Sequence, residues 1–482
     1  MQIASLSRGV FALSRLGARL VVVVVVVVGA PRTALAERMT LRDSLETATR
    51  NYGEIRAKEA RRDAARHDLS YTEKTYLPDV VLSAQQGFGT VNAMHGPLYA
   101  PGGPGNASTS LPLAEQSWNA AFGALYSASV HWNVLTFGKI ERQIELSSRT
   151  HDLRQRELEL ERFHHQIRVT FAYLKLSTAQ RIHHIQKENV SRYEVALETI
   201  ASHAESGLVP GVDASFARAE LASAKSLQLK AYDTELEASK ELAVLLGVPF
   251  REFELEPTFY ESAPENVLPR APVDDGHPLL SMHDGKVRRS EQEEKVASSE
   301  GLPSLFVFGV LQGRGSGFGS DYARNQDALS RSYFDGVGID RGNYIVGLGL
   351  SWNLSSFLRS RSSTSAQEDR TRALSREREL AAQELVAQER FAERKFALSH
   401  DNRTHALSQR EAATDGFRQS KARYDNGLGT IVELTQAIFT VSRAEVDFEL
   451  AQSAIWQALL LRAAASGDLN AFLQQARGVK TR

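Results

Sequence analysis

The chain has 482 residues, a length that would suit two or three ordinary globular domains. Its 57 Lys and Arg residues almost cancel its 58 Asp and Glu residues, so no global field attracts nucleic acid or acidic lipid, and no nucleic-acid partner is expected. It contains no cysteine, which excludes disulfides, thiolate metal sites, thiol nucleophiles and a lipid anchor on an N-terminal cysteine.

The N-terminus carries the features of a secretory signal. Three arginines precede an apolar run that consists of Leu20 and eight valines, and a small-residue triplet, Ala34-Leu35-Ala36, follows it. The apolar run is about half of the roughly 20 residues that a membrane-spanning helix needs, so a spanning helix is the weaker interpretation. We expect residues 1–36 to be a signal peptide that is cut after Ala36, so that the mature chain lies outside the cytoplasm.

The remainder of the chain contains an internal sequence repeat. Paired features recur at a constant shift of 220 residues: Trp132-Asn133 and Trp352-Asn353, Gly207-Leu208 and Gly427-Leu428, Gly247 and Gly467. This pattern predicts a tandem duplication, with one structural repeat over 37–248 and a second over 279–467. Residues 249–278 hold six of the 14 prolines and form the connecting segment, and residues 468–482 form a tail.

Each repeat has the same predicted order of elements. In the first, a helix ends at Leu77-Pro78, and two strands enclose a Gly- and Pro-rich external loop over 92–119. The second strand alternates with Leu125 as the one exception, and Phe122, Tyr126, Val130 and Trp132 lie on its apolar face. A helix over 139–206, free of Pro and Gly, and a shorter helix over 212–246 follow.

The second repeat predicts strands near 304–312 and 343–354, separated by an external loop over 313–342. A long helix over 358–426 and a short helix over 430–465 follow. The apolar face of the last strand consists of Tyr344, Val346, Leu348, Leu350 and Trp352.

Helix length suggests the architecture. The predicted helix over 139–206 would span about 100 Å at about 1.5 Å per residue, and two shorter helices placed end to end would cover the same length. We therefore expect an antiparallel helical wall with the strands at one end. In lipid, only a closed barrel leaves no unpaired sheet edge, and four strands are too few to close one. Several chains would have to share a barrel.

A second interpretation is a periplasmic coiled-coil protein with a small capping sheet and no open lumen. Such a sheet would expose its aromatic face to water, which soluble proteins avoid. The polar residues that alternate with the aromatic ones favour a pore.

The ordered set of features resembles the TolC family of outer-membrane efflux proteins. The signal, the duplication, the Leu-Pro pairs at Leu77-Pro78 and Leu302-Pro303, the two Gly-Leu breaks and the Leu245-Leu246-Gly247 ending carry this resemblance. It implies a mainly α fold with a membrane β part: a coiled-coil barrel of long helices, and four transmembrane strands per chain in a twelve-stranded trimeric β-barrel. It also implies a Gram-negative outer-membrane protein with a long periplasmic extension, surrounded by outer-membrane lipid.

The resemblance further implies partners and site residues. A periplasmic adaptor (membrane fusion) protein would dock at the helix-turn tips and link the homotrimer to an inner-membrane transporter of RND, ABC or MFS type. Glycine at a helix end and an acid in a first turn also have purely structural explanations. The tip residues so implied are Gly207, Leu208, Gly427 and Leu428 for docking, and Glu433, Gln436 and Asp213 for the pore constriction.

No catalytic or metal-binding pattern stands out. The adjacent pairs His164-His165 and His183-His184 point about 100° apart on a helix and do not readily share an ion. The glycine-rich run over 313–319 lacks the helix that would follow it in a phosphate-binding loop. We expect a passive duct of a tripartite efflux pump or type I secretion system, without enzymatic activity, cofactor or metal; the alternative is a non-conducting periplasmic tether.

Overall fold

The computed structural model describes residues 38–93, 111–207, 209–264 and 276–478. The predicted signal peptide and its cut after Ala36, Leu208, most of the predicted loop over 92–119 and part of the connecting segment lie outside these residues. Met39–Arg482 forms one compact unit, which is described by itself below.

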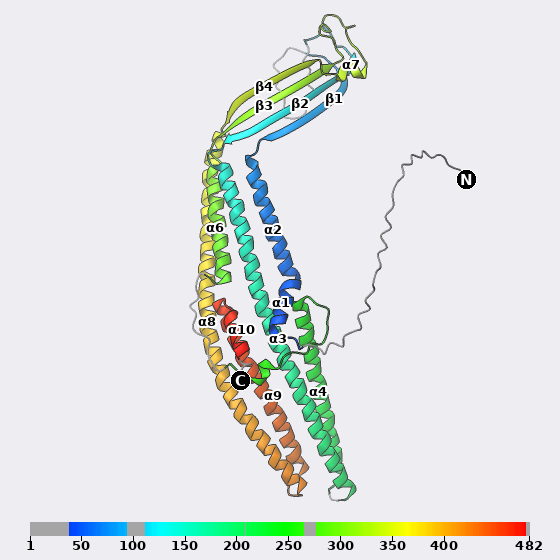
Figure 1. Cartoon of the computed structure of the whole chain (residues 1–482), viewed down its shortest axis with the longest axis vertical. Helices are drawn as coiled ribbons and strands as arrows, with labels where there is room; N and C mark the ends of the chain where they lie inside the picture. The colour runs from blue at the N-terminus through cyan, green and yellow to red at the C-terminus, as the bar shows by residue number, and fades with distance from the viewer. Residues whose placement is uncertain (1–37, 94–110, 208, 265–275, 479–482) are drawn as a thin grey trace, which may run out of the picture. The chain divides into compact units, whose positions relative to one another are not determined.

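Four strands form a single antiparallel sheet in the order β1-β2-β3-β4 (Figure 1). Their bounds are Asp79–Thr90, Ala120–Leu135, Ser304–Ser316 and Arg341–Ser351. β3 runs into the glycine-rich segment that was expected to be loop, because Gly313 and Gly315 pair with Tyr126 and Ala124 of β2. The segment between β3 and β4 also contains a short helix, α7, at Tyr333–Val337. The predicted loop over 313–342 is therefore shorter than its sequence suggests.

The two repeats each supply one very long and one shorter helix. α3 spans Lys139–Glu205 and α8 spans Leu354–Asp425, whereas α4 (Gly211–Leu246) and α9 (Ile431–Ser466) have 36 residues each. α8 begins four residues before the predicted start at 358, because the side chain of Asn353 accepts a hydrogen bond from the Ser356 backbone and caps it there. β4 correspondingly ends at Ser351.

The shorter helices lie beside the long ones. α1 (Leu41–Asn51), α2 (Gly53–Glu73), α4 and α6 (Pro278–Ser299) all contact α3, and α6 and α9 also contact α8. Figure 1 shows α2 and α6 on the sheet side of the helical wall and α4 and α9 at its other end. Lys74–Tyr76 adds one 3-10 turn before β1. In the described part of the chain, no helix is long and apolar enough to cross a membrane.

The middle of the wall holds the main core. The described part of the proline-rich segment, with α5 (Thr258–Glu261), and the C-terminal helix α10 (Asn470–Gly478) contribute to this core beside α3 and α9. Phe259 stacks edge-on against Trp456, whose indole also meets Phe472 edge-on at 5.8 Å. Trp456 and Phe472 are fully buried. The segment that joins the repeats and the tail that follows them thus pack together at this level.

The duplication is visible in the backbone. Gly207 and Gly427 have φ angles of +71° and +72°, at equivalent breaks between a long and a short helix. A left-handed conformation of this kind favours glycine, which has no Cβ to clash. The same local turn is therefore built twice, which confirms the duplicated fold predicted from the 220-residue shift.

Candidate functional site

The sheet separates its side chains into two faces of different character. Side chains directly opposite one another in an antiparallel pair share a face, and the register pairs Ala84 with Tyr126, Tyr126 with Gly313 and Leu311 with Tyr344. One face therefore collects the apolar side chains of all four strands, and it is here called the apolar face. It includes every strand residue that was predicted to meet lipid: Phe122, Tyr126, Val130, Trp132, Tyr344, Val346, Leu348 and Leu350, with Trp352 just beyond the end of β4.

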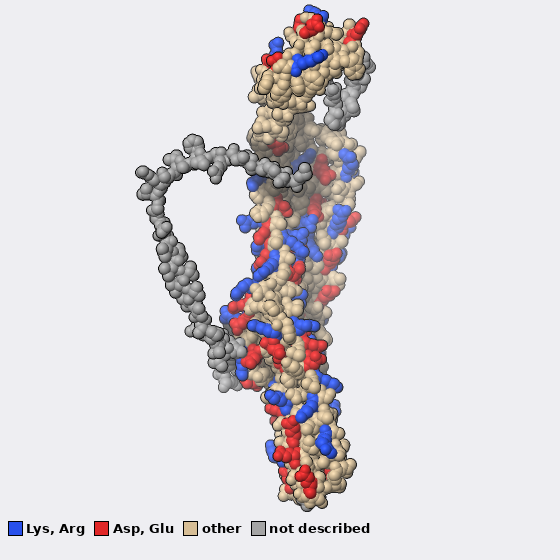
Figure 2. Space-filling model, turned by 90° about the vertical axis from the view of Figure 1, so that its right-hand side faces the viewer, with Lys and Arg blue, Asp and Glu red and all other residues tan. Residues whose placement is uncertain are grey.

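Much of the apolar face is uncovered in the single chain. Tyr344 is 83% exposed, and Leu82 and Val346 are similarly open. Figure 2 shows charged side chains of both signs over the helices, whereas those at the sheet end gather toward its far rim. An open apolar surface of this breadth is typical of a membrane or protein contact.

Tryptophans lie where the sheet meets the helices. The indole N–H of Trp132 donates to the Tyr76 carbonyl at 2.8 Å, and that of Trp352 donates to the Gly301 carbonyl at 3.0 Å. Both rings remain partly exposed. Satisfied N–H groups on half-open rings suit the boundary between lipid and water, where one end of the side chain is apolar and the other is wet.

The opposite end of the apolar face is covered by α7. Tyr333 contacts Phe122 edge-on at 5.2 Å, and the Tyr126 hydroxyl donates to the Val337 carbonyl at 3.1 Å. Phe122 and Tyr126 are consequently half-buried, and Phe334, which is 82% exposed, presents an aromatic ring in their place. From Trp132 to Phe122 the strand advances about 33 Å, or about 25 Å along the normal of a barrel with tilted strands, which is the height of a lipid-facing band.

The other face, here called the polar face, mixes polar and aromatic residues. Ser127 and Ser129 follow the expected pattern, but Phe306 and Phe308 also lie on this face, opposite Gly349 and Gly347. A Cβ added to Gly349 would clash with the Phe306 ring, so the ring lies over backbone that only glycine leaves free. The sequence analysis did not predict that aromatic rings would lie on the polar face. The glycines at alternate positions of β4, Gly347 and Gly349, were the signal that could have indicated it.

Each helix-turn tip ends in a glycine with a left-handed backbone conformation. Gly427 and Leu428 close the end of α8, where the Leu428 N–H donates to the Arg423 carbonyl at 2.8 Å. The Leu428 side chain is 72% exposed. Gly207 forms the equivalent turn after α3, whereas Leu208 lies outside the described residues.

Glu433 is folded back onto the start of its own helix. Its carboxylate accepts from the Thr430 backbone N–H at 3.3 Å, while the Thr430 hydroxyl accepts from the Glu433 N–H at 3.2 Å. The Arg423 guanidinium lies 4.0 Å from the same carboxylate. Gln436, one turn on, is exposed. Glu433, the acid at the predicted constriction, thus both caps its own helix and lies near Arg423, a residue that the sequence analysis did not single out.

A buried tyrosine sits beside the other predicted acid. Tyr424 belongs to the tip core and is almost fully buried, and its ring stacks near that of His203 with centroids 6.2 Å apart. Burial raises the pKa of the Tyr424 hydroxyl, and the negative charges of Asp213 and Asp425 raise it further. Asp213 of α4 and the end of α8 are thereby brought into electrostatic contact, which no spacing in the sequence indicated.

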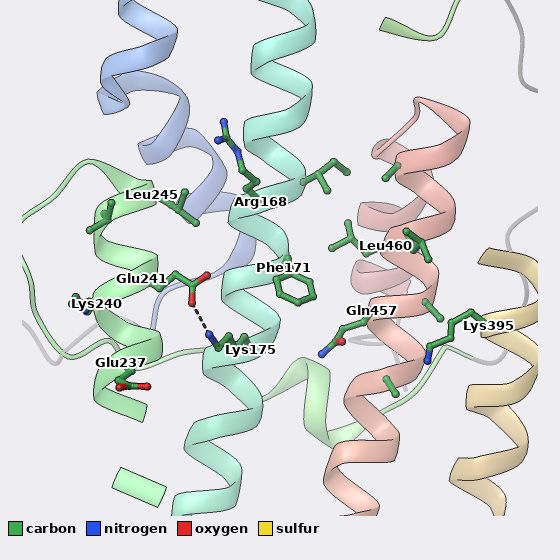
Figure 3. Close-up of a pocket in the computed structure, with 16 residues that line it drawn as sticks. Arg168, Phe171, Lys175, Glu237, Lys240, Glu241, Leu245, Lys395, Gln457 and Leu460 are labelled. Carbon is green, nitrogen blue, oxygen red and sulfur yellow. Dashed lines mark hydrogen bonds and ion pairs between the residues drawn. The ribbon is translucent and has the colours of Figure 1, made fainter. Parts of the chain in front are cut away.

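A groove of about 930 Å³ runs between α3, α4 and α9 in the middle of the wall (Figure 3). Phe171 lies beside it and is about half exposed, as is the ion pair between Lys175 and Glu241, with N and O atoms 2.7 Å apart. Val244 and Leu460 contribute apolar lining. This arrangement offers a surface for contact and no nucleophile or base poised for chemistry.

The histidine pairs are used by the helical packing. His183 shares a 2.7 Å hydrogen bond with Glu235 of α4, and His165 is buried against the ring of Tyr52 with centroids 3.8 Å apart. Within the residues that the structure describes, no three His, Cys, Asp or Glu side chains come together as a metal site would require.

The comparisons with known proteins agree with this geometry. Residues 44–248 and 316–467 match the family described as outer membrane efflux protein. The chain belongs to the outer membrane efflux protein family. Its place in that family makes it an outer-membrane efflux channel of Gram-negative bacteria. A comparison with curated proteins found no significant match.

Solved structures of outer-membrane channels share the fold. CusC is 12% identical with a TM-score of 0.71, over 90% of this chain and 96% of CusC. CmeC of Campylobacter jejuni is 14% identical with a TM-score of 0.69, over 89% and 85% of the two chains. MtrE of Neisseria gonorrhoeae, solved in an open state, is 14% identical with a TM-score of 0.66, over 89% of each chain. The predicted fold class, long helical hairpins joined to a four-stranded membrane sheet, is confirmed.

Proposed function

We propose that three copies of this chain share one twelve-stranded barrel and form a passive exit duct for solutes pumped by other proteins. The observation that carries this proposal is the open four-stranded sheet with one apolar face. β1 and β4 are its edge strands, so each has one side without a partner strand among the described residues. In lipid each unpaired backbone group costs several kcal/mol, so the edges need strands from further copies. A long periplasmic extension of the helices accompanies this barrel.

The helical wall supports the same assembly. The groove beside Phe171 leaves apolar side chains open in the single chain, among them Val244. A second copy laid against this wall would cover them, as hydrophobic burial favours. The sheet and the wall would then be closed by the same neighbouring copies.

The tips are the proposed place of contact with the pump. Gly207 with Leu208, and Gly427 with Leu428, would receive a periplasmic adaptor, which connects the duct to an inner-membrane transporter of RND, ABC or MFS type in a tripartite pump or type I secretion system. The exposed Leu428 side chain supports an apolar contact there. Glu433, Gln436 and Asp213 would line the constriction, with the charge of Glu433 partly balanced by Arg423.

The first experiment is the mass of the detergent-extracted assembly from an outer-membrane fraction. A trimer that forms ion-conducting pores in planar bilayers supports the duct, and Glu433→Ala then tests the constriction through its conductance. A monomer in the soluble periplasm would remove the shared barrel and favour the non-conducting tether.

A matched pair of variants tests the orientation of the sheet. Leu348 lies on the apolar face and Ile345 on the polar face of the same strand. Leu348→Arg would place a charge in lipid, at a cost of roughly 2–4 kcal/mol near the midplane, and reduce the assembled outer-membrane fraction. Ile345→Arg would face the lumen and leave assembly intact. Equal loss in both variants would contradict the assignment of the faces.

A further inference from the structure

The polar face of the sheet is arranged in cross-strand rows. The register pairs Gln85 with Leu125, Leu125 with Arg314 and Arg314 with Arg341, so one row crosses all four strands. None of these four side chains is acidic. The next row toward the helices, Ser83, Ser127, Gln312 and Asn343, is polar and uncharged.

Two arginines therefore face each other directly across β3 and β4. Like charges in opposite positions of an antiparallel pair are destabilising. Arg314 donates through Nε to the Gln312 side-chain oxygen at 3.0 Å, a neutral acceptor. Neither Arg314 nor Arg341 has an acidic partner within 4.0 Å in the described residues. The two arginines weaken the sheet and form no ion pair with an acid, so their presence suggests a role other than stability.

In the described residues no acid forms an ion pair with this row within 4.0 Å, although Asp340 precedes Arg341 in the chain. Asp79 lies on the same face but pairs with His131, six residues along the strand from the arginine row, which is about 20 Å. That distance exceeds the Debye length of about 8 Å at physiological ionic strength. In the loop between the strands, Asp340 accepts from the Ser316 N–H at 3.2 Å and Asp335 accepts from the Ser330 hydroxyl at 2.7 Å.

We propose that Arg314 and Arg341 form an anion-attracting ring in the outer half of the barrel lumen, and that the duct favours anionic solutes. This inference rests on the proposed function, because it takes the polar face as the lumen and three copies as the assembly. Two guanidinium groups from each copy would then circle the pore at one level. Rings of Arg or Lys select anions because field lines concentrate in a narrow, low-dielectric passage.

The experiment measures the chloride-to-potassium permeability ratio from reversal potentials in planar bilayers under a KCl gradient. We compare the wild type with Arg314→Gln, Arg341→Gln and the double variant. The control is Arg42→Gln, which removes the same charge from an exposed residue of α1 that pairs with Glu46. We expect the permeability ratio to fall about twofold or more in the double variant. This fall should be smaller in 1 M salt than in 0.1 M salt, because screening is stronger at the higher concentration.

The absence of cysteine gives a second variant that separates charge from folding. Arg341→Cys would be assembled first and then treated with a cationic or an anionic thiosulfonate reagent. The cationic adduct should raise the permeability ratio toward that of the wild type, and the anionic adduct should lower it. If the pores conduct but the permeability ratio of the double variant equals that of the wild type, and neither reagent changes the ratio of Arg341→Cys, the arginine ring is wrong and the duct still stands. A wild-type assembly that does not conduct would overturn the duct itself.

Discussion

The middle of the helical wall and its tip are stabilised in different ways. In the middle, large aromatic side chains such as Tyr173, Trp456 and Phe472 are fully buried in one continuous core that includes both repeats. The tip core is smaller, and Leu428, Val212 and Val432 around it are exposed. Local stability follows buried apolar contact, so the middle should resist opening while the tip opens at lower free energy. The proposed duct would therefore open most readily at its tip.

The largest expected effect is in the middle. Trp456→Ala removes a fully buried indole that also donates to the Ser262 carbonyl at 3.0 Å. We expect a loss of about 3–5 kcal/mol in the free energy of unfolding, measured by denaturant titration of the detergent-solubilised protein. Leu229→Ala, at an exposed residue of α4, is the control and should change it by less than about 0.5 kcal/mol. Similar losses in both variants would remove the contrast between a packed middle and an open surface.

A pH-dependent effect is expected where α1 meets α2. Burial first, and then the nearby Arg168, lower the pKa of His165 to about 4, although the backbone of Leu245 partly opposes this. The unfolded chain, with a pKa near 6.5, binds the proton more readily, so stability is full above that pH and is lost as pH falls toward 4.

The measurement is the unfolding free energy at pH 7 and pH 5. The wild type should lose roughly 1–2 kcal/mol more than His165→Phe, which keeps an aromatic ring beside Tyr52 but cannot bind a proton. An identical pH response in the two proteins would show that this histidine does not titrate as expected.

A smaller effect is expected at the tip. Thr430→Ala removes the hydroxyl that accepts from the Glu433 N–H and caps α9, while the backbone N–H at position 430 can still donate to the Glu433 carboxylate. The local cost should be about 1 kcal/mol, seen as faster hydrogen exchange in the first turn of α9 with no change near Trp456. Thr440→Ala is the control, since that hydroxyl bonds only within its own helix turn, to the Gln436 carbonyl and side chain. Equal acceleration at the tip and the middle would mean that the two regions open together.

The smallest effect concerns the exposed ion pair at the same tip. Arg423 and Glu433 are both more than half exposed, and the distance between their charged atoms is 4.0 Å. Arg423→Gln should change the free energy of unfolding by less than about 0.5 kcal/mol, because solvent screens such pairs. A loss above 1 kcal/mol would show that the pair is shielded in the assembly.

The sheet was easier to predict than the tip, for a physical reason. A strand has a period of two, so the alternation from Phe122 to Val134 was sufficient to assign a face before any partner strand was known. The ends of β3 and β4 were less evident, because glycines in a strand carry no hydrophobic signal and their pairing depends on the neighbouring strand. The cover of Phe122 by α7 depends likewise on a chain reversal that no local pattern encodes.

The sequence by itself determined the duplication, the positions of the long helices and the apolar side of each strand, because periodicity and helix breakers act over a few residues. Only the tertiary structure decided which side chains meet across elements. It placed Tyr424 near Asp213, aligned Arg314 with Arg341, and brought Phe259 and Phe472 against Trp456. Such contacts join segments that can be more than two hundred residues apart, and their geometry follows from the packing of whole helices and the register of whole strands.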